Sequence, residues 1–173
     1  RATYYYRRLF TDAALAVDAA RALPFTDAER VAVTGGSQGG GLAIAAAALN
    51  PAVAAVATDV PFLCHFERAL SITDRDPYGE IVRYLARYRD RVEPTLDVLA
   101  HFDGVNLAGL ASAPALFSVA LRDQTCPPST VFAAFHAWGG ADKAIEVYRY
   151  NDHEGGGEYH LPKKLAFLAA HLR

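Results

Sequence analysis

The pentapeptide 35–39, Gly-Gly-Ser-Gln-Gly, is the sharpest chemical signal in the sequence. It stands between a short β-branched run, 31–34, and an Ala-rich stretch of helical character, 41–49. A G-x-S-x-G pattern in this context is typical of a strained strand-to-helix turn that exposes the serine hydroxyl. We therefore predict that Ser37 is a nucleophile. The amide of Gln38, at the helix N-terminus, is placed to stabilise a developing oxyanion.

Glycine is expected two residues before and after the serine, at Gly35 and Gly39, because side chains there would keep the strand and helix apart. Two other interpretations of the turn remain. In one, Ser37 only caps the following helix. In the other, the glycines cradle a phosphate, but no Lys-[Ser/Thr] pair follows and the spacing does not match G-x-G-x-x-G.

A serine hydroxyl is a poor nucleophile unless a histidine takes its proton and a carboxylate orients that histidine. Asp123 lies just beyond a predicted strand, 114–121, and His153 just beyond another, 145–150. The carboxyl ends of parallel strands meet at one edge of a sheet, and Ser, Asp, His is the order found along α/β-hydrolase chains. We assign Asp123 as the orienting acid and His153 as the base.

Other acidic and basic residues compete for these roles. Asp59 also follows a predicted strand, 53–58, and is the rival carboxylate, whereas Asp103 and Asp152 are expected to be turn residues. The other histidines lie in predicted helices or do not directly follow a strand: His65, His101, His136, His160 and His171.

Strands and helices alternate along the chain, which predicts a parallel sheet with right-handed crossovers. We expect residues 1–173 to form one partial α/β domain with about four parallel strands and flanking helices. A polar amphipathic region is expected from 67 to 103. So small a sheet needs cover at both edges, from neighbours or from a part of the domain that is missing. The expected helices are 11–23, 41–49, 80–89, 129–138 and 159–172.

Composition excludes several classes of protein. With 52% hydrophobic and 21% charged residues and a net charge of −2, the chain suits a soluble globular domain without the basic field that nucleic acids or anionic membranes require. The apolar run 42–49 is shorter than the roughly 20 residues of a membrane span. Cys64 and Cys126 are too few for a disulfide framework, which favours a reducing compartment. No metal-ligand spacing occurs, and acyl transfer needs no cofactor. The start, lacking methionine and a signal pattern, suggests that the natural N-terminus is absent.

The sequence resembles the acetyl xylan esterase and cephalosporin-C deacetylase family, the seventh family of carbohydrate esterases. The resemblance runs from end to end and is carried by GGSQGGG (35–41), DVPFLC (59–64), FDGVN (102–106), DQTCPPST (123–130) and HEGGG (153–157).

The resemblance implies an α/β-hydrolase fold of which this chain is the C-terminal half, without the N-terminal strands. It implies the same triad, Ser37, Asp123 and His153, with Gln38 giving one oxyanion amide. It further implies that Phe62, Pro77 and Thr125 line the acyl pocket.

The family's activity is the deacetylation of small acetylated sugars, short xylo-oligosaccharides and cephalosporin C. The resemblance therefore implies a small acetylated substrate, no cofactor, a cytoplasmic location and a homo-oligomer, a hexamer whose active sites face an inner chamber. Family members carry a further segment before the position of Tyr4, which supplies the second oxyanion amide. Two alternatives stay open: an α/β-hydrolase of other specificity, such as a peptidase or dienelactone-type enzyme, and a catalytically incompetent fragment or assembly module.

Overall fold

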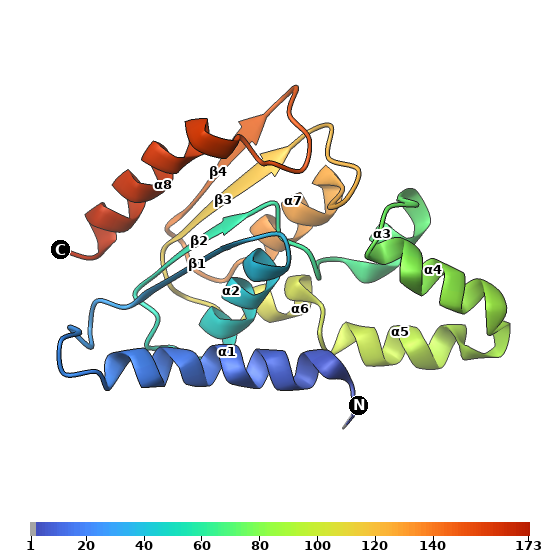
Figure 1. Ribbon diagram of the computed structural model, residues 1–173, viewed down its shortest axis with the longest axis horizontal. Coiled ribbons are helices and arrows are strands. Elements are labelled where there is room, and N and C mark those ends of the chain that lie inside the picture. The colour runs from blue at the N-terminus through green and yellow to red at the C-terminus, as the bar shows by residue number, and fades with distance from the viewer. Residues whose placement is uncertain (1–2) are drawn as a thin grey trace.

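The computed structural model describes residues 3–173 and shows a four-stranded parallel sheet flanked by helices (Figure 1). The strands stand in the sheet in chain order, and each neighbouring pair is parallel. The predicted α/β architecture is therefore confirmed. The strands are β1 (Ala32–Gly36), β2 (Ala55–Asp59), β3 (Ala115–Ala120) and β4 (Lys143–Tyr148).

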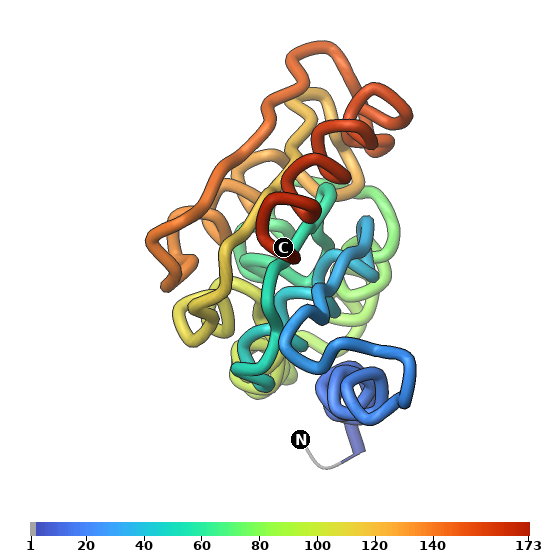
Figure 2. The backbone as a smooth tube through the Cα atoms, turned by 90° about the vertical axis from the view of Figure 1, so that its left-hand side faces the viewer, coloured from blue at the N-terminus to red at the C-terminus, as the bar shows by residue number. Residues whose placement is uncertain are grey.

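Helices cover both faces of the sheet (Figures 1 and 2). In β2, Thr58 faces α2, where Gly40 approaches it, whereas the next residue, Asp59, faces α8 and contacts Lys164. Consecutive strand residues point to opposite faces, so α2 and α8 lie on opposite sides. Within residues 3–173, no helix is both long and apolar enough to cross a bilayer. The helices are α1 (Tyr5–Arg21), α2 (Gln38–Leu49), α3 (Phe66–Ile72), α4 (Tyr78–Arg87), the 3₁₀-helix η1 (Arg89–Arg91), α5 (Val92–Ala100), α6 (Gly104–Ala108), α7 (Pro128–Ala137) and α8 (Gly157–His171).

The larger hydrophobic core is built around the central strand β3, all of whose residues are buried. An apolar strand buried on both faces is typical of a parallel sheet. Phe117 of β3 packs edge-on against Trp138 at the end of α7, and Ile44 of α2 belongs to the same core. A second cluster, rich in aromatic rings, includes Phe62 and Tyr78 and lies beneath α1, α3 and α5. The two clusters hold the loops at the carboxyl edge of the sheet.

Several helices differ from the sequence-based expectation. Helix α1 begins at Tyr5 rather than Thr11, and α2 begins at Gln38 rather than Gly41. Glycine has low helix propensity, but the strained turn before α2 feeds directly into the helix, so tertiary packing overrides that propensity. The helix expected over 80–89 is α4, which runs from Tyr78 to Arg87. The rest of the polar region 67–103 also contains the short helices α3 and α5, which were not predicted and which pack on the aromatic cluster.

The expectation that Asp103 is a simple turn residue was incomplete. Its buried carboxylate caps α6 by accepting a hydrogen bond from the Val105 amide at 2.9 Å. The same carboxylate accepts from the amides of His65 at 2.7 Å and Phe66 at 2.8 Å, at the start of α3. Asp103 therefore fixes the starts of two helices to each other.

The steric role expected of the glycines around Ser37 is confirmed at one of the two positions and wrong at the other. A Cβ at Gly35 would lie 2.3 Å from the main chain of Gly39, so the steric prediction is right for Gly35. It is wrong for Gly39, where a Cβ would have nothing within 4 Å. The tight approach of α2 instead occurs at Gly41, whose Cβ would lie 2.3 Å from the carbonyl oxygen of Phe62.

This difference predicts opposite effects of two alanine substitutions in one helix. We expect Gly41→Ala to lower the free energy of unfolding by about 1–3 kcal/mol, because the main chain of Phe62 must shift. We expect Gly39→Ala to leave stability unchanged or to raise it by up to about 1 kcal/mol, because alanine is the better helix former. Thermal or denaturant unfolding of the complete polypeptide containing this chain measures both, and equal destabilisation would contradict the packing described.

Candidate active site

The turn between β1 and α2 holds Ser37 in an unusual conformation, with φ 54° and ψ −117°. A non-glycine residue keeps such a conformation only when its surroundings enforce it. Here the Ser37 amide donates to the carbonyl of Asp59 at 2.9 Å. The Ser37 carbonyl accepts from the amides of Phe62 at 2.9 Å and Gly41 at 3.1 Å. The main chain of Ser37 is thus fixed by β2 and the loop after it, which leaves the hydroxyl free to contact other groups.

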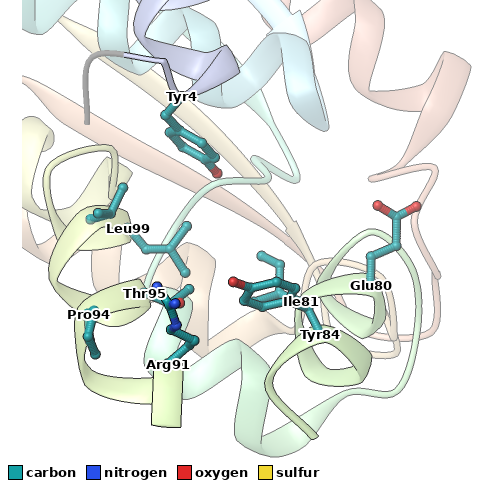
Figure 3. A pocket seen from close by; sticks show the side chains of 9 residues that line it. Tyr4, Glu80, Ile81, Tyr84, Arg91, Pro94, Thr95 and Leu99 are labelled. Atoms are coloured by element: carbon teal, nitrogen blue, oxygen red, sulfur yellow. The ribbon is translucent and has the colours of Figure 1, made fainter. Parts of the chain in front are cut away.

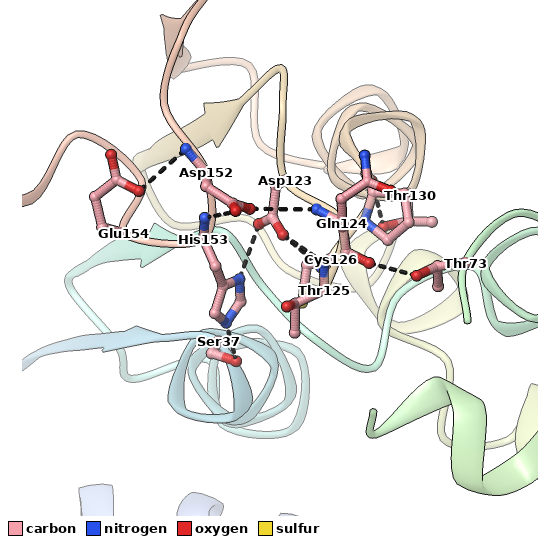
Figure 4. Close-up of polar contacts among 11 residues, drawn as sticks. Ser37, Thr73, Asp123, Gln124, Thr125, Cys126, Thr130, Asp152, His153 and Glu154 are labelled. Carbon is pink, nitrogen blue, oxygen red and sulfur yellow. Dashed lines mark hydrogen bonds and ion pairs between the residues drawn. The ribbon is translucent and has the colours of Figure 1, made fainter. Parts of the chain in front are cut away.

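The structure brings the three residues of the predicted triad together (Figure 4). The Nε2 atom of His153 lies 2.9 Å from Oγ of Ser37, and its Nδ1 atom lies 2.9 Å from Oδ2 of Asp123. An ionised carboxylate can only accept, so Nδ1 carries the hydrogen and donates to Asp123. Nε2 is then the acceptor for the Ser37 hydroxyl. This is the proton path of a Ser-His-Asp hydrolase.

Asp123 is buried, with 1% of its surface exposed, and both of its oxygens are used. Oδ1 accepts from the amides of Thr125 and Cys126, each at 2.8 Å, while Oδ2 faces the imidazole of His153. A buried carboxylate is tolerated only when it is hydrogen-bonded in this way. The loop after β3 therefore presents a fixed negative charge to the ring.

The imidazole of His153 is more basic than an isolated one. Its hydrogen bond to Asp123 raises the pKa of His153 above 6.5, burial acts in the opposite direction, and the charges of Asp123, Asp152 and Glu154 add to the rise. The loop itself is braced by Asp152, whose Oδ1 accepts from the His153 amide at 2.9 Å. Asp152 is a turn residue, as expected, and its carboxylate does not bond the imidazole.

Gln38 follows Ser37 and starts α2, which is the position expected for an oxyanion-hole amide. Its side chain donates from Nε2 to Oη of Tyr6 at 2.9 Å. The ring of Tyr6 lies against Phe10 and Phe62. From the sequence, residues 4–6 were interpreted as an exposed approach to a helix or an oligomer contact. Their spacing does not show that α1 would pass the nucleophile turn, so the contact between Tyr6 and Gln38 was not predicted.

The three residues expected to line the acyl pocket lie at different depths. Phe62 is 4% exposed, stacks edge-on against Tyr78, and its amide bonds the Ser37 carbonyl. Thr125 is half-buried and bonds Asp123 through its amide. Pro77 precedes α4 and adjoins Tyr78 in sequence. Phe62 and Thr125 thus contact triad residues directly, and the pocket role of all three stays a prediction.

A cavity of about 550 Å³ lies away from this constellation, between α4, α5 and the start of the chain (Figure 3). Tyr4, Ile81, Tyr84, Arg91 and Leu99 are among the residues that line it, and none of its lining residues belongs to the triad. The cavity does not define the site of chemistry. Within residues 3–173, no group of three or more His, Cys, Asp or Glu side chains is arranged to hold a metal ion.

The rival carboxylate, Asp59, does not face the imidazole of His153. Its oxygens contact His160 and Lys164 of α8 instead. Asp59 reaches the site only through its main chain, which accepts the hydrogen bond from the Ser37 amide. The geometry therefore favours Asp123 as the partner of His153.

Known proteins resemble this chain over nearly its whole length. A family model described as acetyl xylan esterase (AXE1) matches residues 1–171. The solved acetyl xylan esterase from Paenibacillus sp. R4 is 40% identical, with a TM-score of 0.94 over 99% of this chain and 54% of its own. Acetyl xylan esterase 1 from Thermoanaerobacterium sp. JW/SL YS485 is 35% identical, with a TM-score of 0.87 over 96% of this chain and 54% of its own.

A curated relative, the acetyl esterase Axe7A of Xylanibacter ruminicola, is 28% identical over 79% of this chain and 30% of its own length. The chain thus spans about half the length of the solved relatives and less of the curated one. Because the family model covers nearly the whole sequence, the chain belongs to the acetyl xylan esterase (AXE1) family.

Proposed function

We propose that the complete protein containing this chain is a serine esterase that removes acetyl groups from small acetylated carbohydrates or cephalosporin C. The observation that carries the proposal is the continuous proton path from the Ser37 hydroxyl through His153 to Asp123, with both contacts at 2.9 Å. Membership of the acetyl xylan esterase (AXE1) family supports the acyl group and the substrate class.

In the proposed reaction, Oγ of Ser37 attacks the acetyl carbonyl carbon while Nε2 of His153 takes the hydroxyl proton. The amide of Gln38 stabilises the negative charge that develops on the carbonyl oxygen. The protonated imidazole then gives its proton to the sugar oxygen as the ester bond breaks, leaving an acetyl-enzyme. Water, activated by His153, releases acetate and restores Ser37. Asp123 stabilises the imidazolium in both steps.

A short acyl group suits the surroundings of the triad. Phe62 contacts Ser37 through its main chain and Cys126 contacts Asp123 in the same way, and both side chains are buried. We propose that these residues limit the space beside the triad, so that a short acyl group fits and a long one does not. We propose that Phe62, Pro77 and Thr125 bound the acyl pocket.

We also propose, from the family resemblance, that the protein works in the cytoplasm as a homo-oligomer, a hexamer, and needs no cofactor. Its partners would be small acetylated molecules rather than nucleic acid or membrane. The net charge of −2 supports the proposal that nucleic acid is not a partner, because phosphate binding relies on a basic surface.

Removal of the nucleophile gives the first test. We expect Ser37→Ala to lower kcat for p-nitrophenyl acetate by about 10⁶-fold in the complete protein, since no other group can form the acyl-enzyme. Ser112→Ala, which changes an exposed serine in the loop before β3, is the matched control and should keep full activity. Substantial turnover by Ser37→Ala would contradict the assignment of the nucleophile.

The raised pKa of His153 predicts a pH profile. The imidazole is a base only when unprotonated, so kcat/KM should rise with pH through an apparent pKa above 6.5. Asp123→Asn removes the largest cause of the rise, and we expect the acidic limb to move to lower pH while kcat falls by about 10⁴-fold. A limb that stays in place or moves to higher pH in this variant would contradict the ion pair as its cause.

The size of the acyl pocket is tested by a series of p-nitrophenyl esters. We expect kcat/KM to fall by about tenfold or more for each step beyond propionyl, because extra methylenes have no space beside Phe62. A preference for octanoyl esters, or faster cleavage of peptide substrates, would favour an α/β-hydrolase of other specificity instead.

A further inference from the structure

A cluster of polar side chains, of which His160 is buried and Asp59, Lys164 and Tyr148 are half-buried, lies on the α8 face of the sheet, behind the nucleophile turn. Oδ1 of Asp59 lies 3.0 Å from Nε2 of His160, within ion-pair distance but outside hydrogen-bond geometry, and Oδ2 contacts Nζ of Lys164. Nδ1 of His160 lies 2.9 Å from Oη of Tyr148. His160 is 2% exposed. The cluster therefore joins β2, β4 and α8 in the interior of the protein.

The charge state of the cluster follows from its contacts. Burial would raise the pKa of the Asp59 carboxyl, but the contacts with His160 and Lys164 outweigh burial and lower it. Asp59 is thus ionised and can only accept, and its Oδ1 lies within ion-pair distance of Nε2 of His160. On the other side of the ring, Nδ1 of His160 lies within hydrogen-bond distance of the Tyr148 hydroxyl.

At one end, the cluster reaches the nucleophile. Asp59 pairs with Gly36 in the sheet register, and its carbonyl accepts the hydrogen bond from the Ser37 amide at 2.9 Å. Ser37 has φ 54°, a conformation that needs support from its surroundings. Because the Asp59 side chain is held by His160 and Lys164, the carbonyl that supports Ser37 is held as well.

At the other end, the cluster reaches the loop that carries the base. His160 lies in the first turn of α8, and its amide donates to the carbonyl of Gly156 at 3.2 Å. Gly156, with φ 89°, follows His153 by three residues. A Cβ at Gly156 would lie 2.4 Å from the ring of Tyr148, so the loop rests directly on that ring. The hydroxyl of the same Tyr148 contacts His160, so the loop is linked to the cluster through this side chain as well.

We propose that Asp59, His160 and Tyr148 are positioning residues that hold the Ser37 turn and the His153 loop at the separation required for proton transfer. This inference rests on the proposed esterase function. Polar contacts among side chains that are largely removed from solvent constrain the geometry of the elements that carry them. A displacement of about 1 Å between a nucleophile and its base can cost about 10²-fold in rate.

The test compares variants of the complete protein with p-nitrophenyl acetate as substrate. The end point of fluorophosphonate labelling counts active sites, and kcat is expressed per labelled site. We expect His160→Leu to lower this kcat by about 10-fold to 100-fold with KM little changed, because the base is displaced while the acyl pocket is not. His160→Gln, whose amide N–H can still face Asp59, should recover part of the loss.

Tyr148→Phe keeps the ring and removes only the hydroxyl, so it tests the cluster even if His160→Leu does not fold. We expect a smaller loss of kcat per labelled site and a matching fall in the rate of labelling. Tyr159→Phe is the matched control, since its side chain is on the same helix as His160 and 74% of the residue is exposed.

A lower melting temperature with an unchanged kcat per labelled site, in both Tyr148→Phe and any folded His160 variant, would overturn the positioning role. The cluster would then be structural only. Absence of turnover and labelling in the unmodified protein would instead contradict the proposed function, and this inference with it.

Discussion

The imidazole of His153, held between a buried carboxylate and a serine hydroxyl, is the interaction on which the rest of the structure depends. Asp123 is a charge in the protein interior, which is costly unless hydrogen bonds satisfy it. Two backbone amides and the imidazole meet that requirement. The same arrangement fixes the ring tautomer, so that Nε2 faces Ser37 as a proton acceptor. The hydrogen bonds that stabilise the Asp123 carboxylate therefore also set the orientation of the His153 ring.

The fold meets this constraint through the direction of its strands. Ser37, Asp123 and His153 each follow a different strand, and the parallel arrangement brings those strand ends to one edge of the sheet. The loops are then fixed by local devices. Glycines admit the close approach of α2 to the Phe62 loop, and Asp103 joins the starts of α3 and α6. Residues that are far apart in the sequence are thus brought into contact at one edge of the sheet.

Much of this arrangement could be predicted from the sequence, for physical reasons that also explain the errors. A β-branched run before G-x-S-x-G identifies a buried strand and the turn after it, and the residues beyond two later strands gave Asp123 and His153. Of the short helices between 66 and 108, α4 was predicted, but α3, α5 and α6 were not, because aromatic packing and the Asp103 cap rather than periodicity hold them. Gly39 was wrongly expected to be needed for close packing, and His160 was not expected to form a cluster, for a related reason. Whether a Cβ would meet another atom, and whether a histidine in a helix is buried, depend on tertiary contacts that residue spacing does not reveal.

Covalent acylation of Ser37, with His153 as the base, is the step on which the proposed esterase reaction depends. The most direct measurement is peptide mass spectrometry of the complete protein, quenched in acid during turnover of p-nitrophenyl acetate. We expect a single added acetyl group on the peptide that contains Ser37, and no such group when Ser37 is replaced by alanine. Turnover without any acetylated peptide, or with the acetyl group on another residue, would contradict Ser37 as the nucleophile.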